Sequence, residues 1–118
     1  MGKLIYIVLI FAINGNMVFG QRKIIHLPDL PGFVTLKCDL HLHTVFSDAD
    51  VWPTVRVDEA LQDGLDAIAI TDHLEYTPRK DLIPADPDAA WKVAVQYARE
   101  KNLILVHGTE ITRFKMPP

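Results

Sequence analysis

Histidines and carboxylates gather in three short segments of the sequence. These residues are His41, His43 and Asp48, then Asp72 and His73, and finally Glu110. His41 and His43 are separated by a single residue, so on a strand their imidazoles project from the same face and can bind one metal ion. Several carboxylates and imidazoles at one place are costly without cations to balance them. Nitrogen and oxygen ligands of this kind suit zinc, manganese or iron.

Each of these residues also has a simpler explanation that the sequence leaves open. Two histidines at this spacing occur by chance, Asp48 or Asp72 can cap a turn, and Glu110 can be a solvated loop acid. His107 stands beside Glu110 rather than at a repeated strand end, so a non-ligand role is expected for it. His26 lies in a proline-containing segment and is expected to be a solvated loop residue.

Strand-like and helix-like segments alternate along the chain and must position these side chains. From residue 34 the apolar residues alternate with polar ones. One face would carry Leu36, Cys38, Leu40 and Leu42, and the other Lys37, Asp39, His41 and His43. On this pattern Cys38 is a small core residue, and Asp39 shares the histidine face and orients an imidazole.

The remaining pattern predicts a β-α-β-α-β order. A short amphipathic helix is expected over residues 55–63, with Gly64 as its stop, followed by an apolar strand over residues 65–70. A second helix is expected over residues 87–101, with Asp86 as its N-cap, and a third strand over residues 103–106. This order predicts a parallel sheet. The histidines and acids then fall at the carboxyl ends of the strands, where ligands bind in such folds.

The N-terminal segment has the features of a secretory signal peptide, predicted over residues 1–20. Lys3 precedes an unbroken apolar run at residues 4–13, which is shorter than the roughly 20 residues that span a bilayer. A buried strand or helix of the core is the alternative for this run. Residues 21–33 are predicted as a linker because they contain two prolines and a glycine. The expectation is an exported protein, periplasmic or extracellular, with no stable membrane span.

Composition excludes several classes of protein. The chain has 118 residues, 49% of them hydrophobic and 23% charged, so a disordered or fibrous chain is excluded. A formal net charge of −3 argues against a broad basic face that binds nucleic acid. Cys38 is the only cysteine, so no disulfide can form within the chain. A complete (β/α)₈ barrel needs about 250 residues, so 118 residues exclude a complete barrel of this kind.

The combination of motifs is more specific than its parts. It consists of Asp-Leu-His-Leu-His-Thr with a following Phe-Ser-Asp at residues 39–48, Thr-Asp-His at residues 71–73 and Gly-Thr-Glu-Ile-Thr at residues 108–112. Together these motifs resemble the first part of the PHP (polymerase and histidinol phosphatase) domain family. The resemblance implies an α/β fold over residues 34–118, the first β-α-β-α-β portion of a distorted (β/α)₇ TIM-like barrel.

The resemblance also implies roles for individual residues. It assigns metal positions to His41, His43, Asp48, His73 and Glu110. Glu110 would bridge two ions and count as catalytic, and Asp72 is carried over as a supporting catalytic candidate because it precedes a ligand. Two or three divalent ions would activate a water molecule. Chemistry alone adds Arg113, whose guanidinium matches a substrate phosphate, with a surface arginine as the alternative.

The expected function is that of a metal-dependent phosphoesterase acting on phosphomonoesters or nucleotides, including a 5′–3′ exonuclease-type activity. A small phosphorylated substrate or nucleotide is the expected partner, and nucleic acid would enter only as substrate. The family's later histidine and Asp-x-His ligands do not follow Glu110, so the chain is expected to be a fragment or truncated product. The alternative is a catalytically inactive metal- or partner-binding domain. A doubly wound binding domain is disfavoured because residues 44–50 contain no glycine.

Overall fold

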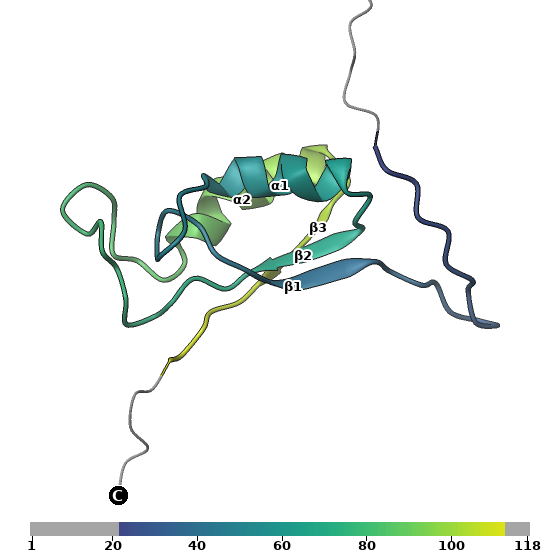
Figure 1. Ribbon diagram of the computed structural model, residues 1–118, viewed down its shortest axis with the longest axis horizontal. Helices are drawn as coiled ribbons and strands as arrows, with labels where there is room; N and C mark the ends of the chain where they lie inside the picture. The colour runs from purple at the N-terminus through teal and green to yellow at the C-terminus, as the bar shows by residue number, and fades with distance from the viewer. Residues whose placement is uncertain (1–21, 113–118) are drawn as a thin grey trace, which may run out of the picture.

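The computed structural model describes residues 22–112, which form a three-stranded parallel sheet with two helices on one of its faces (Figure 1). In chain order the elements are β1 (Cys38–Leu42), α1 (Pro53–Gln62), β2 (Ala67–Ile70), α2 (Ala89–Glu100) and β3 (Ile104–His107). The predicted order of elements is therefore confirmed. The predicted signal peptide and Arg113 lie outside the described residues. Within residues 22–112, no helix has the length and apolarity needed to cross a bilayer.

The central strand β2 holds the core together. It lies between β1 and β3 and runs parallel to both. Ile68 and Ile70 are at most 2% exposed and pack in one cluster with Val57 of α1 and Ala94 of α2. Alanine carries only a methyl group, so α2 can lie close to the sheet without leaving voids. The two helices and the central strand thus form one hydrophobic core on one side of the sheet.

Local signals set the ends of the helices. Pro53 lies in the first turn of α1, where its missing N–H costs no hydrogen bond, and Gly64 follows the helix with a φ of +77°. The sequence predicts Asp86 as the N-cap and Pro87 as the first residue of the second helix, but α2 begins at Ala89. The reason is a turn, in which the Asp86 carboxylate accepts the backbone N–H of Asp88 at 2.9 Å before the helix begins.

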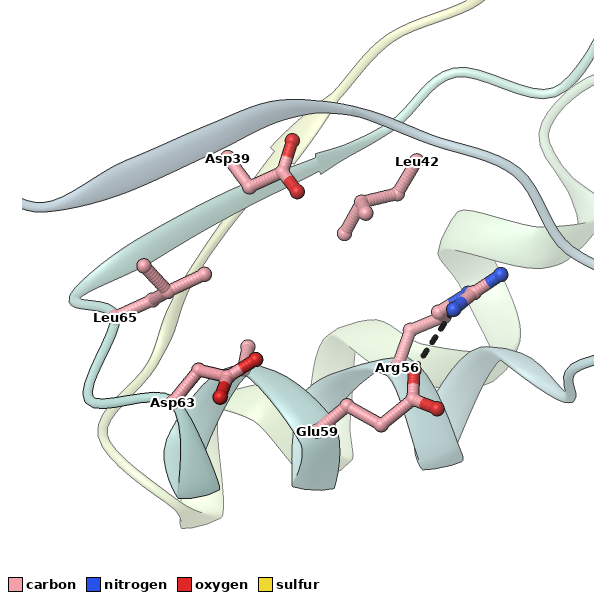
Figure 2. A pocket seen from close by; sticks show the side chains of 7 residues that line it. Asp39, Leu42, Arg56, Glu59, Asp63 and Leu65 are labelled. Carbon is pink, nitrogen blue, oxygen red and sulfur yellow. Dashed lines mark hydrogen bonds and ion pairs between the residues drawn. The ribbon is translucent and has the colours of Figure 1, made fainter. Parts of the chain in front are cut away.

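A β-bulge in β1 changes the predicted assignment of its two faces. Asp39 pairs with Ile68 and Leu42 with Ile70, so between these pairs β1 has one residue more than β2. The extra residue breaks the two-residue alternation and puts Asp39 and Leu42 on the same face. Both side chains point from β1 toward α1 (Figure 2). The prediction that Asp39 shares the face of the histidines is therefore wrong.

The surroundings of Asp39 and Cys38 differ accordingly from those predicted. Asp39 accepts the backbone N–H of His41 at 3.1 Å, and this contact supports the bulge instead of orienting an imidazole. Cys38 is exposed, so the prediction of a core cysteine is wrong. Cys38 pairs with Ala67 of β2, and Ala67 pairs in turn with Ile104 of β3. Both Ile104 and Val106 of β3 are exposed. In the described residues, helices cover one face of the sheet and leave the other open.

A pocket of about 310 Å³ lies between β1 and α1 (Figure 2). Its lining consists of Asp39, Leu42, Arg56, Glu59, Ala60, Asp63 and Leu65. Arg56 pairs with Glu59 at 2.8 Å and donates from Nε to the carbonyl oxygen of His43 at 2.9 Å. This arginine ties α1 to the end of β1, at the point where the chain enters the loop between these two elements.

Candidate metal centre

The five side chains predicted to bind metal meet at the carboxyl ends of the three strands. They are His41, His43, Asp48, His73 and Glu110, and they form two groups whose possible ligand atoms lie within 4.8 Å of one another. The parallel sheet explains this meeting, because the carboxyl ends of parallel strands lie at one edge. His41 lies in the bulged end of β1, His43 directly follows the strand, and Asp48 lies in the adjoining loop.

The first group consists of His41, His43 and Glu110. The Nε2 atoms of the two histidines are 3.0 Å apart, and each lies 2.9 Å from Oε2 of Glu110. Three ligand atoms therefore surround one point, as in sites where three protein ligands leave further positions of the ion open. His43 and Glu110 are largely shielded, with side chains 17% and 26% exposed, whereas the ring of His41 is open to solvent.

The second group consists of His43, Asp48 and His73. Oδ1 of Asp48 lies 2.6 Å from Nδ1 of His43, and Oδ2 of Asp48 lies 3.4 Å from Nε2 of His73. A neutral imidazole that donates its Nδ1 proton to a carboxylate keeps the Nε2 lone pair free. Asp48 can therefore orient His43 for the first group with one oxygen and offer the other oxygen, beside His73, to a second ion.

The electrostatics of the cluster favour positive charge. Desolvation lowers the pKa of His43, but the hydrogen bonds and charges of Asp48 and Glu110 outweigh it, so its pKa is raised above the ordinary value. The hydrogen bond from His43 lowers the pKa of Asp48. The hydrogen bond from Thr112 is the main cause that lowers the pKa of Glu110, helped by His73, His43 and His41. Both carboxylates are thus ionised at neutral pH and can hold a cation.

Backbone pairing fixes His73 beside Glu110. Beyond the ends of β2 and β3, the two segments that follow these strands are joined by a parallel β-bridge between His73 and Glu110. Leu74 donates its N–H to the carbonyl oxygen of Glu110 at 2.9 Å, and Glu110 donates its own to the carbonyl oxygen of Asp72 at 3.1 Å. The side chains of the second and third motifs therefore start from a rigid frame, although their residues are far apart in sequence.

Asp72 supports the site through hydrogen bonds to the loop that follows His43. Asp72 is buried, with 7% of the residue exposed. Its carboxylate accepts hydrogen bonds from the backbone N–H of Thr44 at 2.7 Å, the Thr44 hydroxyl at 2.6 Å and the Ser47 hydroxyl at 2.5 Å. These contacts pin the loop that joins His43 to Asp48. Asp72 belongs to neither candidate ligand group, so in this geometry it positions the loop.

The sequence comparisons agree with this arrangement. The PHP domain, as a protein family, matches this chain over residues 39–116. The chain belongs to the PHP domain family. The matched region includes all five side chains of the two ligand groups and both helices.

Two solved structures are similar to this PHP domain. One is a two-domain protein from Bacteroides vulgatus that contains a predicted PHP-like metal-dependent phosphoesterase. It is 50% identical with a TM-score of 0.75, over 79% of this chain and 27% of that one. The other is a predicted metal-dependent phosphoesterase from Bifidobacterium adolescentis, 34% identical with a TM-score of 0.54, over 70% of this chain and 24% of that one.

A third protein is similar in sequence. This uncharacterised protein from Methanocaldococcus jannaschii is 34% identical over 83 residues, which are 70% of this chain and 36% of the relative. The PHP domain described here therefore spans between 24% and 36% of the length of the relatives that it matches.

Arg79 is a part of the site that sequence reasoning missed. From the loop after the second motif, its Nη1 donates to the carbonyl oxygens of Val45, Ser47 and Ala49 at 3.3, 3.0 and 3.0 Å, and its Nη2 pairs with Asp50. The guanidinium thus clamps the outer side of the loop that Asp72 holds from within. Backbone carbonyls have no sequence signature, so the spacing of residue types in this PHP domain offered no signal for this contact.

His107, Trp52 and His26 lie outside the two ligand groups. His107 pairs through Nε2 with Asp88 at 3.0 Å and packs against the ring of Trp91, in line with its predicted non-ligand role. Trp52 packs against Phe46 in the first loop, with ring centres 5.6 Å apart. His26 is exposed in a segment without helix or strand, as predicted.

Proposed function

We propose that this PHP domain is part of a metal-dependent phosphoesterase that hydrolyses phosphomonoesters or nucleotides. The observation that carries the proposal is the convergence of Nε2 of His41, Nε2 of His43 and Oε2 of Glu110 within 3.0 Å of one another. His73 and Asp48 form the next group along the same strand edge. The relatives described as predicted metal-dependent phosphoesterases support this reading of the site.

The donor set fits two or three divalent ions such as zinc, manganese or iron. Imidazole nitrogens and carboxylate oxygens are ligands that these metals share. Bound at this edge, such ions would supply a water of lowered pKa and would neutralise charge on a phosphoryl group. The chain itself contributes ligand orientation: Asp48 holds the proton on Nδ1 of His43, and Asp72 holds the loop between them. Arg113 remains our candidate for contact with the substrate phosphate.

We further propose that the sheet continues into a distorted (β/α)₇ TIM-like barrel. β1 and β3 are the two edges of the described sheet, and Ile104 and Val106 of β3 are 50% and 43% exposed. Edge strands with exposed apolar side chains are poorly suited to solvent and normally find a partner. The small share of the relatives' length that this chain spans supports the same proposal.

Localisation and substrate size are also proposals. The apolar run at residues 4–13 supports a signal peptide and export to the periplasm or the extracellular space. The formal net charge of −3 supports a small phosphorylated substrate or a nucleotide over a long nucleic acid. Detection of a shortened protein outside the cytoplasm, beginning near Gln21, would support export, and an unprocessed N-terminus in all fractions would contradict it.

The decisive experiment measures metal in the purified chain. The wild type should retain at least two equivalents of manganese or zinc after dialysis, and it should hydrolyse an aryl phosphate if the chain contains enough of the site. The variant with both His41→Ala and His43→Ala should lose at least one equivalent. The matched control is His26→Ala with His107→Ala, which removes two histidines outside the groups and should leave the metal content unchanged.

The same experiment distinguishes the proposed phosphoesterase from the alternative, a catalytically inactive metal-binding domain. The observation in favour of this alternative is that the chain spans only part of the length of its relatives. A centre that needs metal ligands from the remaining part would then be incomplete. Stoichiometric metal without hydrolysis would support the binding domain. Metal content that is unchanged by loss of both His41 and His43 would overturn the proposed centre.

A further inference from the structure

We propose that Thr112 is a positioning residue of the metal centre. Its hydroxyl holds the His73 ring in the orientation and tautomer in which Nε2 faces Asp48. The inference rests on the proposed function, because it concerns a ligand of the same centre. It concerns a residue outside both ligand groups, at the end of the third motif.

The geometry joins three side chains through one oxygen. Oγ1 of Thr112 lies 2.7 Å from Oε1 of Glu110 and 3.0 Å from Nδ1 of His73. The two partners are themselves 3.6 Å apart, too far for a good direct hydrogen bond. The hydroxyl therefore bridges them, and it occupies the oxygen of Glu110 that does not face the other two histidines.

Donor and acceptor counting then fixes the proton on His73. The carboxylate of Glu110 can only accept, so the single hydroxyl proton of Thr112 must be donated to it. The hydroxyl has lone pairs left for its second partner, and Nδ1 of His73 must therefore carry the proton. In a neutral imidazole the lone pair then lies on Nε2.

The freed lone pair points at another acceptor. Nε2 of His73 and Oδ2 of Asp48 face each other at 3.4 Å. Two acceptors at this separation repel each other unless a proton or a cation lies between them, and a divalent ion can bind both. Because the backbone bridge between His73 and Glu110 already fixes the positions of these two residues, the remaining freedom is rotation of the imidazole, which Thr112 limits.

The test compares Thr112→Val, which keeps the shape but removes the hydroxyl, with Thr112→Ser, which keeps the hydroxyl. Nitrogen NMR of the metal-free chain should report His73 protonated on Nδ1 in the wild type and in Thr112→Ser. In Thr112→Val a substantial part should move to the Nε2-protonated form. This readout needs no metal, and a role confined to general stability would not change it.

Titration with Mn²⁺ supplies the second readout. Loss of an outer hydrogen bond to a ligand typically weakens metal binding about 10–100-fold, so Thr112→Val should weaken at least one equivalent by about 10-fold, with Thr112→Ser within about twofold of wild type. An unchanged tautomer together with unchanged affinity in Thr112→Val would overturn the inference. A wild-type chain that binds no Mn²⁺ would instead overturn the proposed function, while the NMR result would still decide the role of Thr112.

Discussion

Replacing Asp72 by Asn should destabilise the fold and loosen the loop that carries Asp48. The Asp72 carboxylate accepts three hydrogen bonds of 2.5 to 2.7 Å from Thr44 and Ser47, and it is almost fully buried. Asn keeps the size and shape of the side chain but replaces one acceptor oxygen by an NH₂ group. At least one of the three donors then loses its partner.

The expected magnitude follows from this count. A buried donor left without a partner costs about 1–3 kcal/mol, and the two remaining bonds weaken because the acceptor loses its charge. We therefore expect Asp72→Asn to lower the free energy of unfolding by about 2–3 kcal/mol, a large share of the stability of a small domain. Because the loop carries Asp48, binding of Mn²⁺ should weaken by about 10-fold or more.

Urea unfolding followed by circular dichroism measures the first effect. The midpoint should fall at an unchanged slope. Ser47→Ala should cost about 1 kcal/mol alone and less in the Asp72→Asn background, because the hydrogen bond from Ser47 is already weakened when its acceptor loses the charge. The control is Asp81→Asn, the same chemical change at an exposed site, which should stay within about 0.5 kcal/mol of wild type. A midpoint for Asp72→Asn as close to wild type as that of Asp81→Asn would refute the reasoning.

Three further predictions concern the loop held by Arg79, the pH dependence of stability and metal binding, and the close approach of Lys23 to Gly64. Arg79→Lys loses the forked contacts to the loop, so Mn²⁺ titration should show binding at Asp48 weakened by about 10-fold. Because the pKa of His43 is raised above the ordinary value of 6.5, its protonation stabilises the metal-free fold below that value, and this contribution is lost as the pH rises through the folded pKa. The affinity for Mn²⁺ should rise over the same pH window, because the competing proton leaves. Urea unfolding with chelator measures the first trend and calorimetry with Mn²⁺ the second, each at pH 6 and pH 8. Gly64→Ala should lower the urea midpoint, because a Cβ there would lie 2.0 Å from the carbonyl oxygen of Lys23.

The two substitutions each have a matched control. Arg99→Lys lies on the exposed face of α2 and should not change Mn²⁺ affinity; an equal loss in both arginine variants would contradict the clamp. Gly32→Ala shares the left-handed φ of Gly64, but its Cβ would meet no atom within 4 Å, so the smaller midpoint shift expected there isolates the steric contact. Equal shifts in the two glycine variants, or a metal-free chain more stable at pH 8 than at pH 6, would count against the respective arguments.

The elements of this protein were predictable because their signals are local. Apolar run lengths located the strands, and Gly64 marked the end of the first helix, since it acts on its own backbone. The helix itself begins at Pro53, two residues before the predicted start at residue 55. The β-α-β-α-β order then implied a parallel sheet. Parallel strands end at one edge, so the residue types at those ends predicted a metal centre without knowledge of any contact. The choice of the five candidate ligands among them came from the resemblance of the three motifs to PHP domains.

Three features needed the tertiary structure because their causes lie between segments distant in sequence. The bulge in β1 depends on its register with β2, and it places Asp39 toward α1 and leaves Cys38 exposed. The clamp of Arg79 acts on backbone carbonyls, which every residue has and no pattern marks. The bridge of Thr112 depends on the pairing of His73 with Glu110.

The division of labour within the centre has the same origin. The sequence by itself determined which residue types stand at the strand ends and hence that metal chemistry is expected there. Only the tertiary structure decided that His43 belongs to both ligand groups, with Nε2 toward Glu110 and Nδ1 toward Asp48. The physical reason is that an imidazole offers two nitrogens on opposite sides of its ring, and the sequence position does not specify which side each neighbour occupies.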